Sequence, residues 1–201
     1  MSEDSLLILA SGSPRRSDLL REAGFDFEVV PPGIEEIEDS SLPIREVTAD
    51  NADLKAGAIS KARPEAVVLA ADTLVLLGDR NLSKPLDRAE ASAMLRSLNG
   101  NSHQVFTAVT ILRQSPFQHL RFTTITEVRF KTLTESEMDA YHAKINPMDK
   151  AGAYAAQEHG ASIIERIEGS MSNVIGLPMD EVSAALEKNF GIVPAHRNRE
   201  K

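Results

Sequence analysis

The chain has 201 residues, no cysteine and a formal net charge of −8 at pH 7. These values exclude disulfides and cysteine-based zinc or iron–sulfur sites, and the excess of acid argues against general nucleic-acid binding. The length suits one large domain or two lobes that share a core, and no apolar run approaches the length of a membrane span or has the layout of a signal peptide. We therefore expect a cytoplasmic protein with neither a nucleic-acid nor a membrane partner.

A strand, a short polar loop and a helix start are predicted within the first twenty residues. Residues 6–10 are apolar and rich in branched side chains, and Ser13-Pro14 can provide the N-cap and first residue of a helix. This order is typical of a phosphate-binding site. The helix N–H groups and the hydroxyls of Ser11 and Ser13 would bind the anion there.

Two arginines occupy the first turn of this expected helix. Arg15 and Arg16 would lie where the helix macrodipole is already positive, which costs a few tenths of a kcal/mol up to roughly 1 for each. A bound polyphosphate would turn that cost into affinity, because guanidinium groups make forked hydrogen bonds to phosphate. The alternative is an ordinary helix start with two solvated arginines.

Helix and strand patterns alternate in the next part of the chain. Residues 25–30 favour a strand, and a helix that carries Lys55 is predicted from about 43 to 62. The apolar run 66–71 is typical of a strand buried on both faces; Asp72 follows it directly, and the strand continues beyond. Asp72 is either a satisfied turn residue or an active group at a sheet edge where α/β folds collect ligands.

The second half combines capped helices with a long hairpin. Asp87 and Glu90 form a capping box that begins a helix. Residues 103–112 and 120–132 are predicted to be the two strands of the hairpin. The five histidines are scattered without ligand spacing, and we expect His103 to be a hydrogen-bonded structural residue.

Several charged residues lie in loops or near the ends of the predicted elements. The cations are Arg15, Arg16, Lys55, Lys84 and Lys150, and the acids are Glu36, Asp72 and Asp149. If they converge, the cations match a triphosphate, while the acids can hold a hard divalent ion and activate water. Spacing alone does not show convergence. Each lysine is otherwise a surface charge, and the acidic run 34–39 around Glu36 is otherwise a solvated loop.

Seven short motifs follow one another along the chain. They are ASGSPRR at 10–16, ADLKA at 52–56, ADT at 71–73, KP at 84–85, HQVFT at 103–107, DKAGAY at 149–154 and GLP at 176–178. In this order the chain resembles the Maf family of nucleoside triphosphate pyrophosphatases, from about residue 6 to residue 190.

The resemblance implies an α/β fold with a long mixed central sheet flanked by helices. Two lobes with a nucleotide cleft between them would form one domain over residues 1–193, followed by a polar tail at 194–201. The implied reaction is cleavage of a nucleoside triphosphate to the monophosphate and pyrophosphate, with Mg²⁺ or Mn²⁺ as the divalent metal. A homodimer is plausible from the family.

The resemblance also assigns roles to residues. Asp72 would be the proton acceptor that activates water, and Glu36 would lie near the metal with it. Ser11, Arg15, Arg16, Lys55 and Lys84 would bind the phosphates. On the residues alone, Ser13 and Lys150 join this phosphate-binding set, although Lys150 and Asp149 can instead pair with one another.

Base preference follows from three positions. The branch of the family that hydrolyses dTTP and UTP typically has Arg, Thr and Gln there, and this chain has Arg15, Thr73 and Gln157. An amide such as that of Gln157 offers a donor and an acceptor, which matches the N3–H and carbonyls of uracil or thymine. The alternatives are a 7-methyl-GTP or broad-specificity pyrophosphatase, and a nucleotide-binding division-regulatory protein with little turnover.

The chain departs from the family pattern at a few positions. Asn51 stands where an apolar residue is expected, Glu158 where Gly is usual, and Met171 where Tyr is typical. None of these departures removes a catalytic group. Glu158 follows Gln157 directly, so it bears on the loop beside the base.

Overall fold

The computed structural model describes residues 6–37 and 42–195. Within it the chain forms two compact units. The first comprises residues 1–72, 107–123 and 176–201, and the second comprises residues 73–106 and 124–175. Glu38 and Asp39 of the acidic run, and residues 196–201 of the expected tail, lie outside the described residues.

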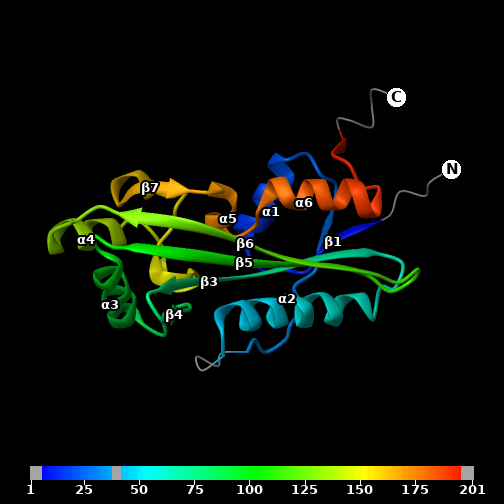
Figure 1. The fold of residues 1–201 in the computed structure, drawn as a ribbon, viewed down its shortest axis with the longest axis horizontal. Helices are drawn as coiled ribbons and strands as arrows, with labels where there is room; N and C mark the ends of the chain where they lie inside the picture. Colours follow the sequence, from blue (N-terminus) through cyan, green and yellow to red (C-terminus); the bar gives the residue numbers. More distant parts are fainter. Residues whose placement is uncertain (1–5, 38–41, 196–201) are drawn as a thin grey trace. The chain divides into compact units, whose positions relative to one another are not determined.

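The strands belong to one mixed sheet with helices beside it, which confirms the predicted α/β class (Figure 1). The sheet has seven strands in the order β2-β1-β3-β5-β6-β7, and β4 also pairs with β3. Strand β1 is parallel to β2 and β3, whereas β4 and β7 are antiparallel to their neighbours. The helices and strands are β1 (Leu7–Leu9), α1 (Pro14–Glu22), β2 (Glu28–Val29), α2 (Ile44–Ser60), β3 (Val67–Leu77), β4 (Arg80–Leu82), α3 (Arg88–Leu98), β5 (Ser102–Arg113), β6 (Gln118–Phe130), α4 (Glu135–His142), β7 (Ile164–Glu168), α5 (Met171–Ile175) and α6 (Met179–Ala185).

In the first unit, alternate residues of β1 and β3 pack on opposite faces of the sheet. Ile8 and Val68 pack with Ala56 of α2 on one face. Leu9 and the other residues of these strands that point the same way pack with Leu20 of α1 and with α6 on the other face. Figure 1 shows α2 on one side of these strands and α1 with α6 on the opposite side. Because side chains alternate along a strand, these strands bury side chains against helices on both faces of the sheet.

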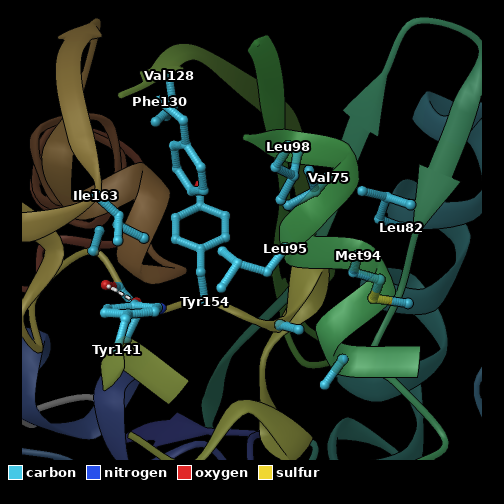
Figure 2. Packing of buried hydrophobic residues seen from close by; sticks show 14 of the residues in the cluster. Val75, Leu82, Met94, Leu95, Leu98, Val128, Phe130, Tyr141, Tyr154 and Ile163 are labelled. Atoms are coloured by element: carbon cyan, nitrogen blue, oxygen red, sulfur yellow. Dashed lines mark hydrogen bonds between the residues drawn. The ribbon is translucent and has the colours of Figure 1, made fainter. Parts of the chain in front are cut away.

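The second unit has a core of its own, in which aromatic rings meet edge to face. Phe130 of β6 and Tyr154 lie 4.9 Å apart between ring centroids with their planes at 85° (Figure 2). Leu95 and Leu98 of α3 pack into the same cluster. The phenol of Tyr141 donates to the carbonyl oxygen of Ala155 at 3.0 Å, so a polar group is buried here with its partner.

Local predictions differ from the structure in two places. The strand predicted over residues 25–30 is reduced to the two residues of β2. The capping box of α3 is only half formed: Asp87 accepts from the N–H of Glu90, but the Glu90 carboxylate accepts from the N–H of Leu86 rather than from that of Asp87. In the described part of the chain, no helix is long and apolar enough to cross a membrane.

Candidate active site

The loop before α1 keeps its polar groups close together. Ser13 is the N-cap residue and Pro14 begins the helix, as predicted. Among the described residues, however, the Ser13 side chain makes no capping hydrogen bond, and the Ser13 N–H donates to Oγ of Ser11 at 3.1 Å. A Cβ added at Gly12 would meet no atom of the described residues within 4 Å. There is open space beside this loop, as binding of a phosphate requires.

Arg16 points back from α1 onto this loop. Its Nε donates to the carbonyl oxygen of Gly176 at 2.8 Å, and its Nη1 donates to Oγ of Ser11 at 3.3 Å. Burial lowers the pKa of the Arg16 guanidinium, while the charges of Asp72 and Glu36 act in the opposite direction. Arg16 is therefore not the solvated charge of the alternative interpretation. It lies within the electrostatic field of both carboxylates.

Lys55 of α2 joins two carboxylates from different parts of the first unit. Its Nζ lies 2.7 Å from Oδ1 of Asp72 and 3.0 Å from Oε1 of Glu36. The side chains of Lys55 and Asp72 are each only 6% exposed, whereas that of Glu36 is 35% exposed. A buried ammonium between two carboxylates offsets much of the cost of burying these charges.

Asp72 lies in the middle of β3 rather than at its end. The parallel pairing of β1 with β3 ends at Leu9 opposite Leu69, and the antiparallel pairing with β4 begins at Val75 opposite Leu82. Asp72 lies between these two paired stretches. Asp72 is thus neither a turn residue nor at the end of its strand: the pairing with β1, which is only three residues long, stops before it, and β3 continues past it.

Asn51 is the site residue that the sequence reasoning missed. It lies one helical turn before Lys55 on α2, and the amide Nδ2 donates to Oδ2 of Asp72 at 3.3 Å. The same amide exchanges two hydrogen bonds with the backbone of Ile37, beside Glu36. Asn51 stood out only as a departure from the family pattern. Its hydrogen-bond partners were not predicted from the sequence.

The first unit can supply two oxygen ligands to a divalent cation. Glu36 and Asp72 share Lys55, so their carboxylates face the same region. In residues 6–37 and 42–195, no group of three or more His, Asp and Glu side chains is gathered as a metal site. Two carboxylates fit Mg²⁺, which proteins commonly hold with one or two carboxylates while substrate phosphates and water complete the shell.

A sequence profile described as Maf-like protein matches residues 6–189. The chain belongs to the Maf family.

Several relatives of this Maf chain carry the name dTTP/UTP pyrophosphatase. The protein from Akkermansia muciniphila is 44% identical over 180 residues, covering 90% of this chain and 94% of the relative. The protein from Bdellovibrio bacteriovorus is 43% identical, covering 90% of this chain and 97% of the relative. The protein from Bacillus pumilus is 42% identical, covering 94% of this chain and 98% of the relative.

Three further predicted site residues lie in the second unit: Thr73, Lys84 and Gln157. Thr73 follows Asp72 in β3, and because side chains alternate along a strand, the two point to opposite faces. Lys84 is exposed just after β4, and Gln157 is exposed in the segment that precedes β7.

Lys150 of the DKAGAY motif is hydrogen-bonded to neighbouring residues of the second unit. Its buried Nζ donates to the carbonyl oxygen of Asn146 and to Oδ1 of Asp149, both at 2.9 Å. Glu158 lies 3.6 Å from the same nitrogen. Of the two alternatives for this pair, the structure shows Asp149 and Lys150 bonded to one another. The departure at Glu158 adds a further anion to Lys150.

His103 is a structural residue in this Maf chain, as predicted. Its ring is buried at the start of β5, where Nε2 lies 2.9 Å from the hydroxyl of Tyr154. The ring meets Phe130 edge to face at 4.9 Å. Burial lowers the pKa of His103 to about 4, so the imidazole is neutral at physiological pH.

Proposed function

We propose that this protein hydrolyses dTTP and UTP to the nucleoside monophosphate and pyrophosphate. The observation that carries the proposal is the buried carboxylate of Asp72, held by Lys55 and lying in the field of Arg16 and Glu36. A pure binding protein has no need for a buried base beside its phosphate-binding groups. The names of the relatives supply the substrate class.

In the proposed reaction, Asp72 accepts a proton from the attacking water. The water oxygen bonds to the α-phosphorus, the bond from that phosphorus to the bridging oxygen breaks, and pyrophosphate leaves. Ser11, Ser13, Arg15 and Arg16 hold the phosphates from the helix start, where hydroxyl, N–H and guanidinium donors stabilise the developing negative charge.

Glu36 and Asp72 are proposed to hold the divalent cation, Mg²⁺ or Mn²⁺. When bound, such an ion neutralises phosphate charge and polarises the reacting group. Lys55 holds both carboxylates beside a positive charge before the ion arrives, and from there its ammonium can also meet a phosphate.

Base preference is proposed to depend on Arg15, Thr73 and Gln157. The exposed amide of Gln157 can donate and accept, which suits the hydrogen-bonding edge of uracil or thymine. Lys84 and Lys150 remain proposed phosphate ligands; Lys150 would have to leave Asp149 and Glu158 for that role. The homodimer and the cytoplasmic location stay predictions.

A panel of nucleoside triphosphates with Mg²⁺ or Mn²⁺ tests this function, with pyrophosphate and monophosphate as the readouts. We expect the highest kcat/KM with dTTP and UTP. Preference for 7-methyl-GTP would reject the branch assignment. Triphosphate binding without release of pyrophosphate would reject the enzyme and favour the nucleotide-binding regulatory protein.

Asp72→Asn tests the proposed base. Loss of a general base typically lowers kcat about 10²- to 10⁴-fold, and we expect a loss in that range with triphosphate affinity largely kept. Asp53→Asn is the matched control, because Asp53 of α2 is an acid paired with Arg121, whereas Asp72 is paired with Lys55. Near-normal kcat in Asp72→Asn would assign the base to another group.

A further inference from the structure

Asn51 is buried and fully engaged within the first unit. It is 2% exposed. The N–H of Ile37 donates to its Oδ1 at 2.7 Å, and its Nδ2 donates both to the carbonyl oxygen of Ile37 at 3.1 Å and to Oδ2 of Asp72 at 3.3 Å. One side chain therefore connects the segment after Glu36 with the carboxylate in β3.

We propose that Asn51 is a positioning residue that holds the Glu36 segment against α2 and fixes the orientation of the Asp72 carboxylate. The inference rests on the proposed function for its catalytic consequence. It adds to that function a residue for which the family pattern, with an apolar side chain expected at this position, has no counterpart.

The segment that carries Glu36 is hydrogen-bonded to Asn51. The two hydrogen bonds between Asn51 and Ile37 close a ring, as paired strands do, and they fix the backbone directly beside Glu36. The Glu36 carboxylate then meets Lys55, one turn along α2 from Asn51. An apolar side chain at position 51 would leave the Ile37 backbone groups without these partners.

The two carboxylate oxygens of Asp72 have different donors on α2. Lys55 holds Oδ1 and Asn51 donates to Oδ2, so both lie against α2. With both oxygens engaged, the carboxylate cannot rotate freely about its last bond. A base held in one orientation loses less entropy when it accepts a proton from a positioned water.

The second unit contains a matched arrangement without a carboxylate. Asn99 exchanges the same pair of hydrogen bonds with the backbone of Leu133, at 2.9 Å and 2.8 Å. Asn99→Ala therefore removes the same kind of amide-to-backbone pair as Asn51→Ala. The two variants differ in that only Asn51 also reaches an acid of the proposed site.

The test compares Asn51→Ala and Asn51→Leu with Asn99→Ala in the full chain. Three properties are measured: hydrogen exchange of the Ile37 amide, the carbon chemical shift of the Asp72 carboxyl by NMR, and kcat and KM for dTTP. Asn51→Leu fills the space with an apolar side chain, so it separates the amide's role from a loss of packing.

We expect both Asn51 variants to raise Ile37 exchange and to change the chemical shift of the Asp72 carboxyl, because its Oδ2 loses a hydrogen-bond donor. We also expect kcat to fall about 10- to 100-fold with KM largely unchanged, as on loss of other residues that orient active groups. Asn99→Ala should change stability but none of these properties.

Unchanged Ile37 exchange or an unchanged chemical shift of the Asp72 carboxyl in the Asn51 variants would overturn the proposal. So would a loss of activity that follows stability alone, as in Asn99→Ala. If the wild-type chain releases no pyrophosphate, the proposed function fails. Exchange and NMR still decide then whether Asn51 holds the segment and the carboxylate.

Discussion

Buried ionisable residues in this chain differ in what surrounds them. Asp72 has an ammonium and an amide as partners, both able to stabilise its charge. His103 has a tyrosine hydroxyl at Nε2 and the rings of Phe130 and Tyr154 around it. The environment of His103 favours the neutral imidazole, whereas Asp72 has a hydrogen-bond donor at each of its two oxygens.

Acid should destabilise the protein through His103. Its pKa is about 4 when folded against an ordinary value of 6.5, so the unfolded chain takes up a proton first as the pH falls. The stability that His103 contributes is therefore present above pH 6.5 and is lost as the pH falls from there toward 4. Between pH 7.5 and 4.5 we expect a loss of about 2–3 kcal/mol from this residue.

Urea unfolding of the wild type and of His103→Gln at these two pH values measures this contribution. The glutamine cannot titrate, so its variant should lose about 2–3 kcal/mol less than the wild type over the same interval. Equal losses in the two proteins would show that the folded-state pKa of His103 is close to its ordinary value.

At the scale of single residues, the sequence predicted the charged members of the site better than the polar one. Lys55, Glu36 and Asp72 were identified because family motifs mark them, and the structure brings them together. Asn51 was noted only as an unusual residue at its position. The sequence alone does not show whether an asparagine amide is hydrogen-bonded within the protein or solvated. The pairing of Lys150 with Asp149 was left open for the same reason.

Among the elements, helices α1 and α4 begin in different ways. Helix α4 has a complete capping box from Thr134 and Glu137. Helix α1 has two arginines in its first turn and no acid there, and its N-cap Ser13 makes no capping bond among the described residues. This helix start fits the proposed binding of a phosphate, because an anion there would offset the two arginine charges.

A pair of N-cap variants tests this difference. Asp87→Ala should cost about 1 kcal/mol, because its carboxylate accepts from the Glu90 N–H, whereas Ser13→Ala should cost less than about 0.5 kcal/mol. Triphosphate affinity should fall only in Ser13→Ala. Calorimetric unfolding and equilibrium binding of dTTP measure the two effects, and equal stability losses would mean that the Ser13 hydroxyl caps the helix.

Element boundaries were predictable where local chemistry decides them. Ser13-Pro14 and Thr134-Glu137 begin helices because the capping preferences are local. Strand β2 is much shorter than its sequence pattern, since the extent of a strand depends on how far its neighbour β1 can pair with it. The position of Asp72 between two paired stretches of β3 likewise depends on partners distant in sequence.

Across the whole molecule, each unit has a hydrophobic core of its own. Leu20 of α1 is fully buried in the first core, and Leu98 of α3 is fully buried in the second. The chain passes between the units within β3, β5 and β6, so three continuous strands contribute residues to both. The α/β class was predictable from the family motifs, but the residues at which the chain divides between the units were not, because no linker composition marks them.

Truncation in either core should therefore destabilise one common transition. Leu20→Ala and Leu98→Ala should each cost about 3 kcal/mol, and lower the melting temperature by about 6–12 °C for a chain of this size. Differential scanning calorimetry measures both. Two separated transitions in either variant would show that the units unfold independently.

The alternation of β3 has a consequence for how such enzymes diversify. Asp72 and Thr73 are neighbours in sequence, yet the strand turns their side chains to opposite faces. We expect substitutions at position 73 to alter nucleotide choice without disturbing the α2 side, where Lys55 and Asn51 hold the carboxylate. A lineage can then explore new substrates at one residue while purifying selection preserves the chemistry at the next.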